Sequence, residues 1–296
     1  NRISKSNQSN KKYILKKNKI IIGTTQFGLP YGIMNFTKKN KKNELKKILS
    51  LAKKEMINDL YTSKYYGSAN KFLIENNLSL FQIYLKFKSS DIILKSFNNE
   101  LKKLKSKFKK KNIIIIIDGF ELLSFKDSSK IYENLINLKK TKDIFKFGFS
   151  IYDFKNLKKI CKRFKPDIIQ CPYSIVDRRL EKNGLIQYFF ENKIKIHVRS
   201  IFLQGLLLTN ISTLPKKFLK WKKIFYDYDD FVRNYKITKI EGCLNFVINN
   251  KFINKVLIGV DNYKQFEEIL TIRNNRKIKL PYIANFNENL INPSRW

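Results

Sequence analysis

Short apolar runs alternate along the chain with longer segments whose apolar residues recur at helical spacing. The short runs are rich in β-branched residues, and several are apolar throughout, which is typical of parallel strands covered by helices. The runs predict eight strands, at Lys19–Gly23, Ile57–Thr62, Phe81–Phe87, Asn112–Asp118, Phe145–Ile151, Asp167–Cys171, Ile194–Ser200 and Lys255–Val260.

The longer segments predict amphipathic helices, with Leu45, Ile48 and Leu51 on one stripe of the first. The predicted helices are Asn43–Met56, Asp91–Lys105, Ser128–Lys140, Asp153–Phe164, Leu185–Asn192, Lys216–Tyr235, Thr238–Asn249 and Tyr263–Thr271. Asp91 and Asp153 are candidate N-caps. Strands that alternate with helices in this way indicate a parallel α/β fold.

Two α/β architectures share this alternation: an open doubly wound sheet and a closed barrel. Eight strand–helix units within 296 residues favour the barrel, which typically uses about 250 residues. The G-x-G-x-x-G motif of a dinucleotide-binding Rossmann unit does not follow the first strand. We therefore predict a single-domain (β/α)₈ TIM barrel over residues 19–296, preceded by a flexible basic tail over residues 1–18.

The chain is strongly basic, with 61 Lys and Arg against 24 Asp and Glu and a formal net charge of +37. Such a balance suits nucleic acid, an anionic membrane or acidic substrates. However, the lysines are spread from end to end, which is typical of solvated helix faces, and the abundant residue types share A/T-rich codons. We therefore expect neither nucleic acid nor a membrane as partner, although the charge should attract phosphates.

The cysteines and the single histidine argue against a disulfide framework and a zinc site. Cys161, Cys171 and Cys243 form no C-x-x-C pair and are odd in number, which favours a reduced, cytoplasmic protein. With His197 as the only histidine, we expect no metal. No apolar run approaches the ~20 residues of a membrane span, and the N-terminal segment lacks an apolar signal core.

Lys86 stands out among the strand residues. It lies in a run that otherwise predicts a buried strand, and it shares a face with Gln82 and Tyr84. A lysine at a barrel-strand end is costly unless it is paired or functional, and its charge can stabilise a neighbouring phenolate. The alternative is a surface lysine at a frayed strand end, which is ordinary in so lysine-rich a chain.

Several motifs occur in an order that resembles the aldo-keto reductase superfamily. The closest resemblance is to a bacterial branch associated with surface-sugar biosynthesis. The matching stretches are Ile22–Gly32, Tyr66–Gly67, Phe147–Tyr152, Asp167–Tyr173, Val198–Leu207 and Asn292–Trp296. Together they cover all but the N-terminal tail, and their shared order is more specific than any one of them.

The resemblance implies reduction of a carbonyl by hydride transfer from NADPH or NADH. The family's general acid is a tyrosine, which matches Tyr66, and the lysine that assists it matches Lys86. The family's aspartate, which holds the lysine, falls at Tyr61. Its histidine falls at Ile117, or at Asp118 if the register moves by one. Two of the four expected catalytic side chains are therefore replaced.

Other residues bear on these two replaced positions. Asp59 lies two residues before Tyr61 and reaches Lys86 only if a bulge or register shift brings it up the strand. His197 is expected to be a structural strand residue. Three outcomes are open: Tyr66 and Lys86 suffice for slow reduction; Asp118, Tyr61 or Arg199 rebuild the site; or the barrel keeps binding without catalysis.

The resemblance also implies a set of cofactor contacts. They are Gly23, Thr24, Ser150, Gln170, Arg199, Ser200, Phe202, Gly205, Gly259, Asp261, Gln265 and Glu268. Ser150 and Gln170 match groups that hold the carboxamide, and Arg199 replaces an aromatic residue that stacks on the nicotinamide. Asp261 stands where basic or hydroxyl residues usually meet a 2′-phosphate, which leaves the choice between NADPH and NADH open.

The sequence thus predicts a NAD(P)H-dependent reductase of an aldehyde, ketone or keto-sugar, with Tyr66 as general acid assisted by Lys86. Tyr61 and Asp118 complete the candidate catalytic set. The alternative is a catalytically impaired barrel that binds a nicotinamide dinucleotide or sugar phosphate without turnover. A third hypothesis, nucleic-acid binding driven by charge, requires affinity that falls steeply with salt.

Overall fold

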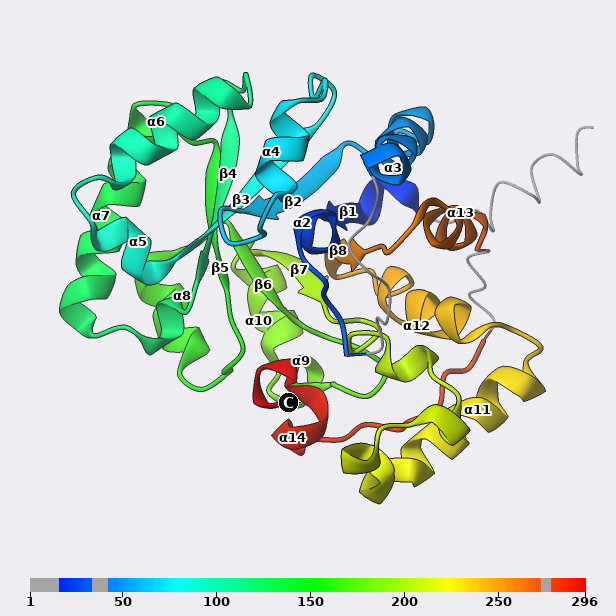
Figure 1. The fold of residues 1–296 in the computed structure, drawn as a ribbon. Helices are drawn as coiled ribbons and strands as arrows, with labels where there is room; N and C mark the ends of the chain where they lie inside the picture. The colour runs from blue at the N-terminus through cyan, green and yellow to red at the C-terminus, as the bar shows by residue number, and fades with distance from the viewer. Residues whose placement is uncertain (1–15, 34–41, 273–277) are drawn as a thin grey trace, which may run out of the picture.

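The computed structural model describes residues 16–33, 42–272 and 278–296. Eight parallel strands close into a barrel in chain order, with helices around the outside (Figure 1). The strands are β1 (Ile20–Gly23), β2 (Asp59–Ser63), β3 (Gln82–Lys88), β4 (Ile113–Asp118), β5 (Lys146–Ser150), β6 (Ile168–Pro172), β7 (Lys195–Arg199) and β8 (Ile253–Gly259). The predicted single-domain (β/α)₈ fold is confirmed.

The larger helices follow the strands as predicted. They are α3 (Lys42–Lys54), α6 (Phe97–Lys107), α7 (Phe125–Lys140), α8 (Leu157–Phe164), α10 (Leu185–Glu191), α11 (Lys222–Asn234), α12 (Lys239–Ile248) and α13 (Tyr263–Thr271). Shorter helices are α2 (Thr25–Gly28), α4 (Ala69–Ile74), α5 (Ser89–Ile93), α9 (Arg179–Lys182) and α14 (Glu288–Ile291). The short helix α4, between β2 and β3, was not predicted.

The segment predicted as one helix, Asp91–Lys105, is two. Helix α5 ends at Ile93, the backbone of Leu94 after it is extended, and α6 begins at Phe97. Asp91 is not an N-cap: it is the third residue of α5, and its carboxylate accepts the backbone N–H of Lys88 at 2.9 Å. Asp91 therefore still satisfies a free backbone N–H at the start of the helix, but it does so as a residue of the first turn and not as the residue before it.

Two other predicted helices begin later than expected. Asp153 precedes α8 by four residues, and its carboxylate accepts the N–H of Lys155 in the turn before the helix. The segment Lys216–Tyr235 starts as a 3₁₀ helix, Lys216–Trp221, and becomes α-helical from Lys222.

Most of the predicted tail, residues 1–15, lies outside the described residues. Lys17 belongs to a 3₁₀ turn and forms an ion pair with Glu55.

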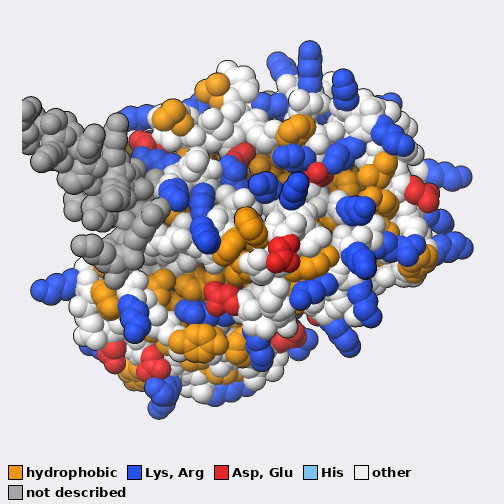
Figure 2. Space-filling model, turned by 180° about the vertical axis from the view of Figure 1, so that it is seen from behind, with side chains coloured by type: hydrophobic (Ala, Val, Ile, Leu, Met, Phe, Trp, Pro, Cys, Tyr) orange, Lys and Arg blue, Asp and Glu red, His pale blue; other side chains and the backbone are white. Residues whose placement is uncertain are grey.

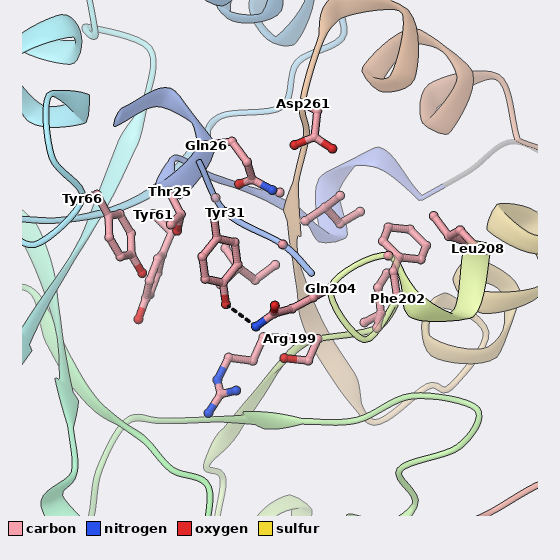
Figure 3. A pocket seen from close by; sticks show the side chains of 18 of the residues that line it. Thr25, Gln26, Tyr31, Tyr61, Tyr66, Arg199, Phe202, Gln204, Leu208 and Asp261 are labelled. Carbon is pink, nitrogen blue, oxygen red and sulfur yellow. Dashed lines mark hydrogen bonds between the residues drawn. The ribbon is translucent and has the colours of Figure 1, made fainter. Parts of the chain in front are cut away.

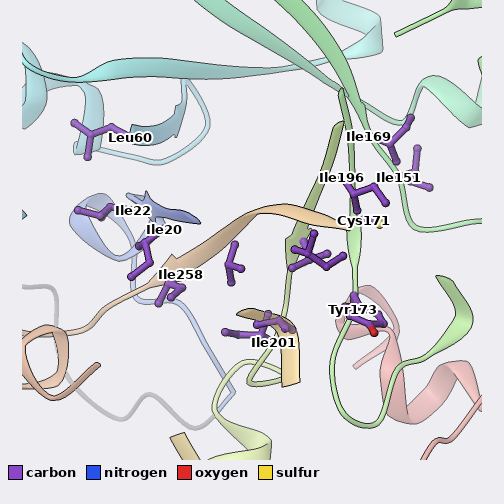
Figure 4. Close-up of a cluster of buried hydrophobic side chains, with 14 of the residues drawn as sticks. Ile20, Ile22, Leu60, Ile151, Ile169, Cys171, Tyr173, Ile196, Ile201 and Ile258 are labelled. Atoms are coloured by element: carbon purple, nitrogen blue, oxygen red, sulfur yellow. The ribbon is translucent and has the colours of Figure 1, made fainter. Parts of the chain in front are cut away.

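The apolar residues form two clusters separated by the wall of the barrel. The outer cluster packs between strands and helices, and Figure 4 shows part of it around Ile22, Leu60 and Ile258. The inner cluster fills the barrel and consists of Ile21, Tyr61, Tyr84, Ile114, Ile116 and Ile168. Alternate residues of each strand therefore face the helices or the barrel axis, as the pleat requires.

Lysine and arginine side chains are scattered over the face seen in Figure 2 and do not gather in one patch. This distribution agrees with the expectation that the dispersed lysines form solvated helix faces. Within the part of the chain that the structure describes, no helix has the length and apolar character needed to cross a bilayer.

His197 lies on the inner face of β7 and is buried, with its ring edge-on to that of Tyr84 at a centroid distance of 5.6 Å. Its Nδ1 atom has no hydrogen-bond partner among the described residues. Burial lowers the pKa of His197 to about 3, and the charges of Lys255, Lys146 and Lys195 act in the same direction. The imidazole is therefore a neutral packing group at neutral pH.

This buried histidine predicts acid lability. The unfolded chain protonates His197 near its ordinary pKa of about 6.5, whereas the folded chain does not until about pH 3. The stabilisation that comes from a neutral His197 is therefore fully present above about pH 6.5 and is lost as the pH falls towards 3. Between pH 6.5 and 5 the free energy of unfolding should fall by about 1–2 kcal/mol. Urea unfolding of the wild type and of His197→Phe at several pH values measures this pH dependence of the free energy of unfolding. An equally steep dependence in the variant would contradict the role of His197.

Candidate active site

A cavity of about 520 Å³ opens at the carboxyl ends of the strands, where α/β barrels place their active sites (Figure 3). All four predicted catalytic residues line it: Tyr61, Tyr66, Lys86 and Asp118. So do ten of the predicted cofactor contacts, namely Gly23, Ser150, Gln170, Arg199, Ser200, Phe202, Gly205, Gly259, Asp261 and Gln265. Residues that are far apart in the sequence therefore meet in one site.

Two predicted cofactor contacts lie outside this cavity. Thr24 is fully buried, and its hydroxyl donates to the carbonyl oxygen of Tyr61 at 3.0 Å, which fixes the turn after β1 against β2. Glu268 lines a neighbouring pocket together with Lys47 and Lys264. Because Gln265 lines both pockets, Glu268 lies just beyond one end of the main cavity.

Tyr66, Lys86 and Asp118 form the central group of the site. The Lys86 ammonium lies 5.7 Å from the centre of the Tyr66 ring, and its Nζ atom donates to Asp118 Oδ2 at 3.1 Å. Burial lowers the pKa of Lys86, but Tyr66 and Asp118 together outweigh burial, so the net pKa lies above the ordinary value. Lys86 is therefore a charged, partnered group at the mouth of the barrel and not a frayed surface lysine.

The strand register decides which residue of β4 faces the cavity. Ile113, Ile115 and Ile117 belong to the outer cluster, whereas Ile114 and Ile116 face the barrel axis. By the same alternation Asp118 faces inward, where it lines the cavity. Of the two residues that the resemblance sets against the family's histidine, Asp118 faces the cavity and Ile117 faces the helices.

Asp59 does not reach Lys86. The pairing of β2 with β3 runs without interruption from Asp59–Gln82 to Ser63–Lys86, so no bulge brings Asp59 up the strand. Asp59 forms an ion pair with Lys255 at the opposite end of the barrel. The carboxylate that accompanies Lys86 therefore comes from β4 and not from β2.

Tyr61 places a second phenol in the cavity beside Tyr66. Its side chain is 2% exposed, and its hydroxyl has no hydrogen-bond partner in the described part of the chain. Burial raises the pKa of Tyr61 well above the ordinary value, and the neighbouring Tyr66 and Asp118 add to this effect. The Tyr61 hydroxyl is thus a neutral, buried donor in the cavity wall with no partner among the described residues.

Close glycine packing positions the Tyr66 loop. A Cβ atom on Gly28 would lie 1.8 Å from the carbonyl oxygen of Tyr66, and one on Gly67 would lie 2.5 Å from the carbonyl oxygen of Gly28. Gly67 also has a φ of +53°, in the left-handed region that favours glycine. The turn after β1 can therefore touch the Tyr66 loop only because both positions lack side chains.

Two further buried donors in the cavity lack partners among the residues described. Gln170 is 1% exposed with an unpaired Nε2, and Arg199 is 8% exposed with an unpaired Nη1. Arg199 stacks on Tyr152, with Cζ 3.7 Å from the ring centre, and donates through Nη2 to the Ile151 carbonyl oxygen at 2.9 Å. Buried native donors are almost always satisfied, so these groups are suited to a bound ligand.

At the other end of the cavity lie Asp261, Gln26 and Gln265. The backbone N–H of Asp261 donates to Gln265 Oε1 at 2.7 Å, and burial raises the pKa of the Asp261 carboxyl. Between the two ends, Gln204 Nε2 donates to the Tyr31 hydroxyl at 3.2 Å (Figure 3). This bond joins the loop after β7 to the loop after β1.

Several lining residues were not among the predicted site residues, and they include the polar side chains of Gln26, Tyr31, Tyr152 and Gln204. One sequence signal could have found Tyr152, because it lies two residues after Ser150 and so continues the same face. The contact between Tyr31 and Gln204 joins residues 173 positions apart, and no local pattern predicts it.

The residues described contain no group of three or more His, Cys, Asp or Glu side chains placed to hold a metal ion. Cys161, Cys171 and Cys243 are buried free thiols. Burial raises the pKa of each of these thiols to about 12, so they are unreactive packing groups at neutral pH.

Solved structures similar to this chain share its fold. An aldo-keto reductase from Bacillus halodurans, in its holo form, is 17% identical, with a TM-score of 0.68 over 85% of each chain. A putative aldo-keto reductase from Pseudomonas aeruginosa is 14% identical, with a TM-score of 0.60 over 87% of this chain and 91% of its own. No curated protein sequence matches this one. The sequence model of the Aldo/keto reductase family matches residues 19–280, nearly all of the barrel, and the chain therefore belongs to the aldo/keto reductase family.

Proposed function

We propose that this protein is a NAD(P)H-dependent carbonyl reductase in which Tyr66 is the general acid, Lys86 assists it and Asp118 holds Lys86. The observation that carries the proposal is the convergence of a phenol, an ammonium and a carboxylate from three strands or their loops on one cavity. The substrate class is an aldehyde, ketone or keto-sugar.

The residues of the cavity fit a nicotinamide dinucleotide. Gln170 offers a buried, unpaired amide donor, which suits the oxygen of a carboxamide, and the buried Ser150 hydroxyl is on the neighbouring strand. Ser200, Phe202 and Gly205 lie on the loop after β7 that borders the cavity, where backbone can approach a pyrophosphate. When bound, the cofactor supplies the hydride.

The chain's own residues would manage the proton and the developing charge. Tyr66 donates its phenolic proton to the carbonyl oxygen, and the Lys86 ammonium stabilises the phenolate that remains. Asp118 keeps the Lys86 ammonium beside the phenol. The Tyr61 hydroxyl, which has no partner of its own in the described residues, is a further donor for the carbonyl oxygen as it gains charge.

The end of the cavity that holds Asp261, where the resemblance expects a 2′-phosphate, carries mixed charge. Asp261 at that end would repel a 2′-phosphate, whereas Lys47 and Lys264 of the adjoining pocket would attract one.

Three free thiols suit a reducing compartment, and we propose a cytoplasmic location on that basis.

Titration of the protein with NADPH and NADH, followed by a panel of aldehydes, ketones and sugars with each cofactor, tests the proposed function. We expect saturable binding of at least one cofactor and oxidation of that cofactor that depends on the carbonyl compound. Binding without turnover of any carbonyl would favour the alternative, a barrel that binds a dinucleotide or sugar phosphate without catalysis. Absence of binding to either cofactor would refute the reductase and the dinucleotide-binding form of the alternative; titration with a sugar phosphate then tests the form that remains.

A further inference from the structure

One buried cation at the reactive end of the cavity, Arg199, forms no ion pair with any described residue. Arg199 ends β7, and its guanidinium is fixed by the Tyr152 ring beneath it and by the carbonyl oxygen of Ile151. Its Nη1 atom is buried and makes no hydrogen bond to any described residue, although the side chain lines the cavity. The guanidinium is therefore held in place with one buried nitrogen that has no partner among the described residues.

The acidic residues of the cavity do not neutralise this charge. Asp118 is close enough to act electrostatically on Arg199, but its Oδ2 already accepts from Lys86. Asp261 lies at the other end of the cavity, near Gln26 (Figure 3). The reactive end thus carries two cations against one carboxylate. A buried charge without a partner is costly, and a guanidinium pairs especially well with a carboxylate or phosphate.

We propose that Arg199 selects small carbonyl substrates that carry a carboxylate or phosphate as well as the reacting carbonyl. This inference rests on the proposed reductase function, and it adds the class of substrate. Tyr61, Tyr66 and Arg199 lie around the same end of the cavity (Figure 3), so one small molecule can present its carbonyl oxygen to the phenols and its anionic group to the guanidinium. Arg199 is then a specificity-determining residue.

The pyrophosphate of the dinucleotide is another source of anionic oxygen for Arg199. If the guanidinium served that group, or stacked on the nicotinamide as the resemblance implies, Arg199 would govern affinity for the cofactor and would be indifferent to the charge of the substrate. The two possibilities differ in what the loss of Arg199 changes: the ratio between charged and neutral substrates, or the dissociation constant of the cofactor.

Matched aldehydes test the inference: 4-carboxybenzaldehyde and its neutral methyl ester. We expect the wild type to prefer the acid. In Arg199→Gln the ratio of kcat/KM for acid over ester should fall about 30-fold, mainly through KM, because a charge-assisted hydrogen bond is lost. Arg199→Lys, which keeps the charge but not the planar guanidinium, should recover part of the ratio. Equal losses for acid and ester would overturn the proposal.

A binding measurement separates this inference from the reductase function. Calorimetry with 4-carboxybenzyl alcohol and its methyl ester needs no turnover, and we expect the acid to bind at least about tenfold more tightly to the wild type. If neither aldehyde is reduced but this preference holds, the reductase function fails and the anion site stands. Equal affinities, or no binding of either alcohol, would overturn the anion site, as would an Arg199→Gln variant that weakens only cofactor binding.

Discussion

Replacement of Tyr66 by Phe is expected to lower kcat about 10³-fold and to leave the cofactor dissociation constant within about twofold. Phenylalanine keeps the ring beside Lys86 but has no proton to give to the carbonyl oxygen. Loss of a positioned acid commonly costs 10²–10⁴-fold in rate. Steady-state kinetics on the best aldehyde of the panel, together with a fluorescence titration of the cofactor, measures both quantities.

The neighbouring tyrosine provides a matched control. Tyr65 donates its hydroxyl to Asp91 Oδ1 at 2.6 Å and does not line the cavity. Tyr65→Phe removes the same atom one residue away, so kcat should stay within about threefold of the wild type. If Tyr66→Phe keeps more than a tenth of the wild-type kcat, another group supplies the proton, and Tyr61→Phe is then the variant to measure.

The barrel was predictable because each strand carries its own signal. Runs such as Ile113–Ile117 are too short for most helices and too apolar for loops, and their spacing leaves room for one helix between strands. The break between α5 and α6 was not predictable, since Leu94, Lys95 and Ser96 include neither Gly nor Pro and the helical spacing continues across them.

Within the site, the residue types were predictable but their partners were not. A run of five isoleucines has no polar alternation, so the sequence does not say whether Ile117 or Asp118 faces the axis. Pairing with β3, which sets Lys86 against Ile116 and Lys88 against Asp118, determines it. The placement of Arg199 likewise depends on Tyr152, which lies on the loop after β5.

The two aspartates considered as partners of Lys86 should have opposite effects when each is changed to asparagine. Asp118→Asn is expected to lower kcat about 10²-fold with a small change in cofactor affinity, because the Lys86 ammonium loses the carboxylate that holds it beside Tyr66. Asp59→Asn should leave kcat within about threefold, since Asp59 pairs with Lys255 and neither residue lines the cavity.

The free energy of unfolding should show the reverse order, with the larger loss in Asp59→Asn and the smaller loss in Asp118→Asn. The Asp59–Lys255 pair is largely buried, with side chains 12% and 26% exposed, so Asp59→Asn leaves an unpaired ammonium and should lower the free energy of unfolding by about 1–3 kcal/mol. Lys86 and Asp118 are similarly placed, at 21% and 27% exposed, but they border an open cavity where water can solvate the remaining charge. We expect the smaller loss of stability there, measured by urea unfolding of both variants.

A positioning role for Asp118 requires more than a lower rate. Asp118→Glu keeps the carboxylate and should recover part of the activity that Asp118→Asn loses, whereas a purely structural aspartate would show no such dependence on charge. The loss should also lie in kcat and not in KM, because Asp118 acts on the proton donor through Lys86 and not on the bound carbonyl. If Asp118→Asn and Asp118→Glu both lose stability but keep the wild-type kcat, Asp118 does not position Lys86. Tyr61 and Tyr66 then orient Lys86 without it, and β4 contributes packing but no chemistry.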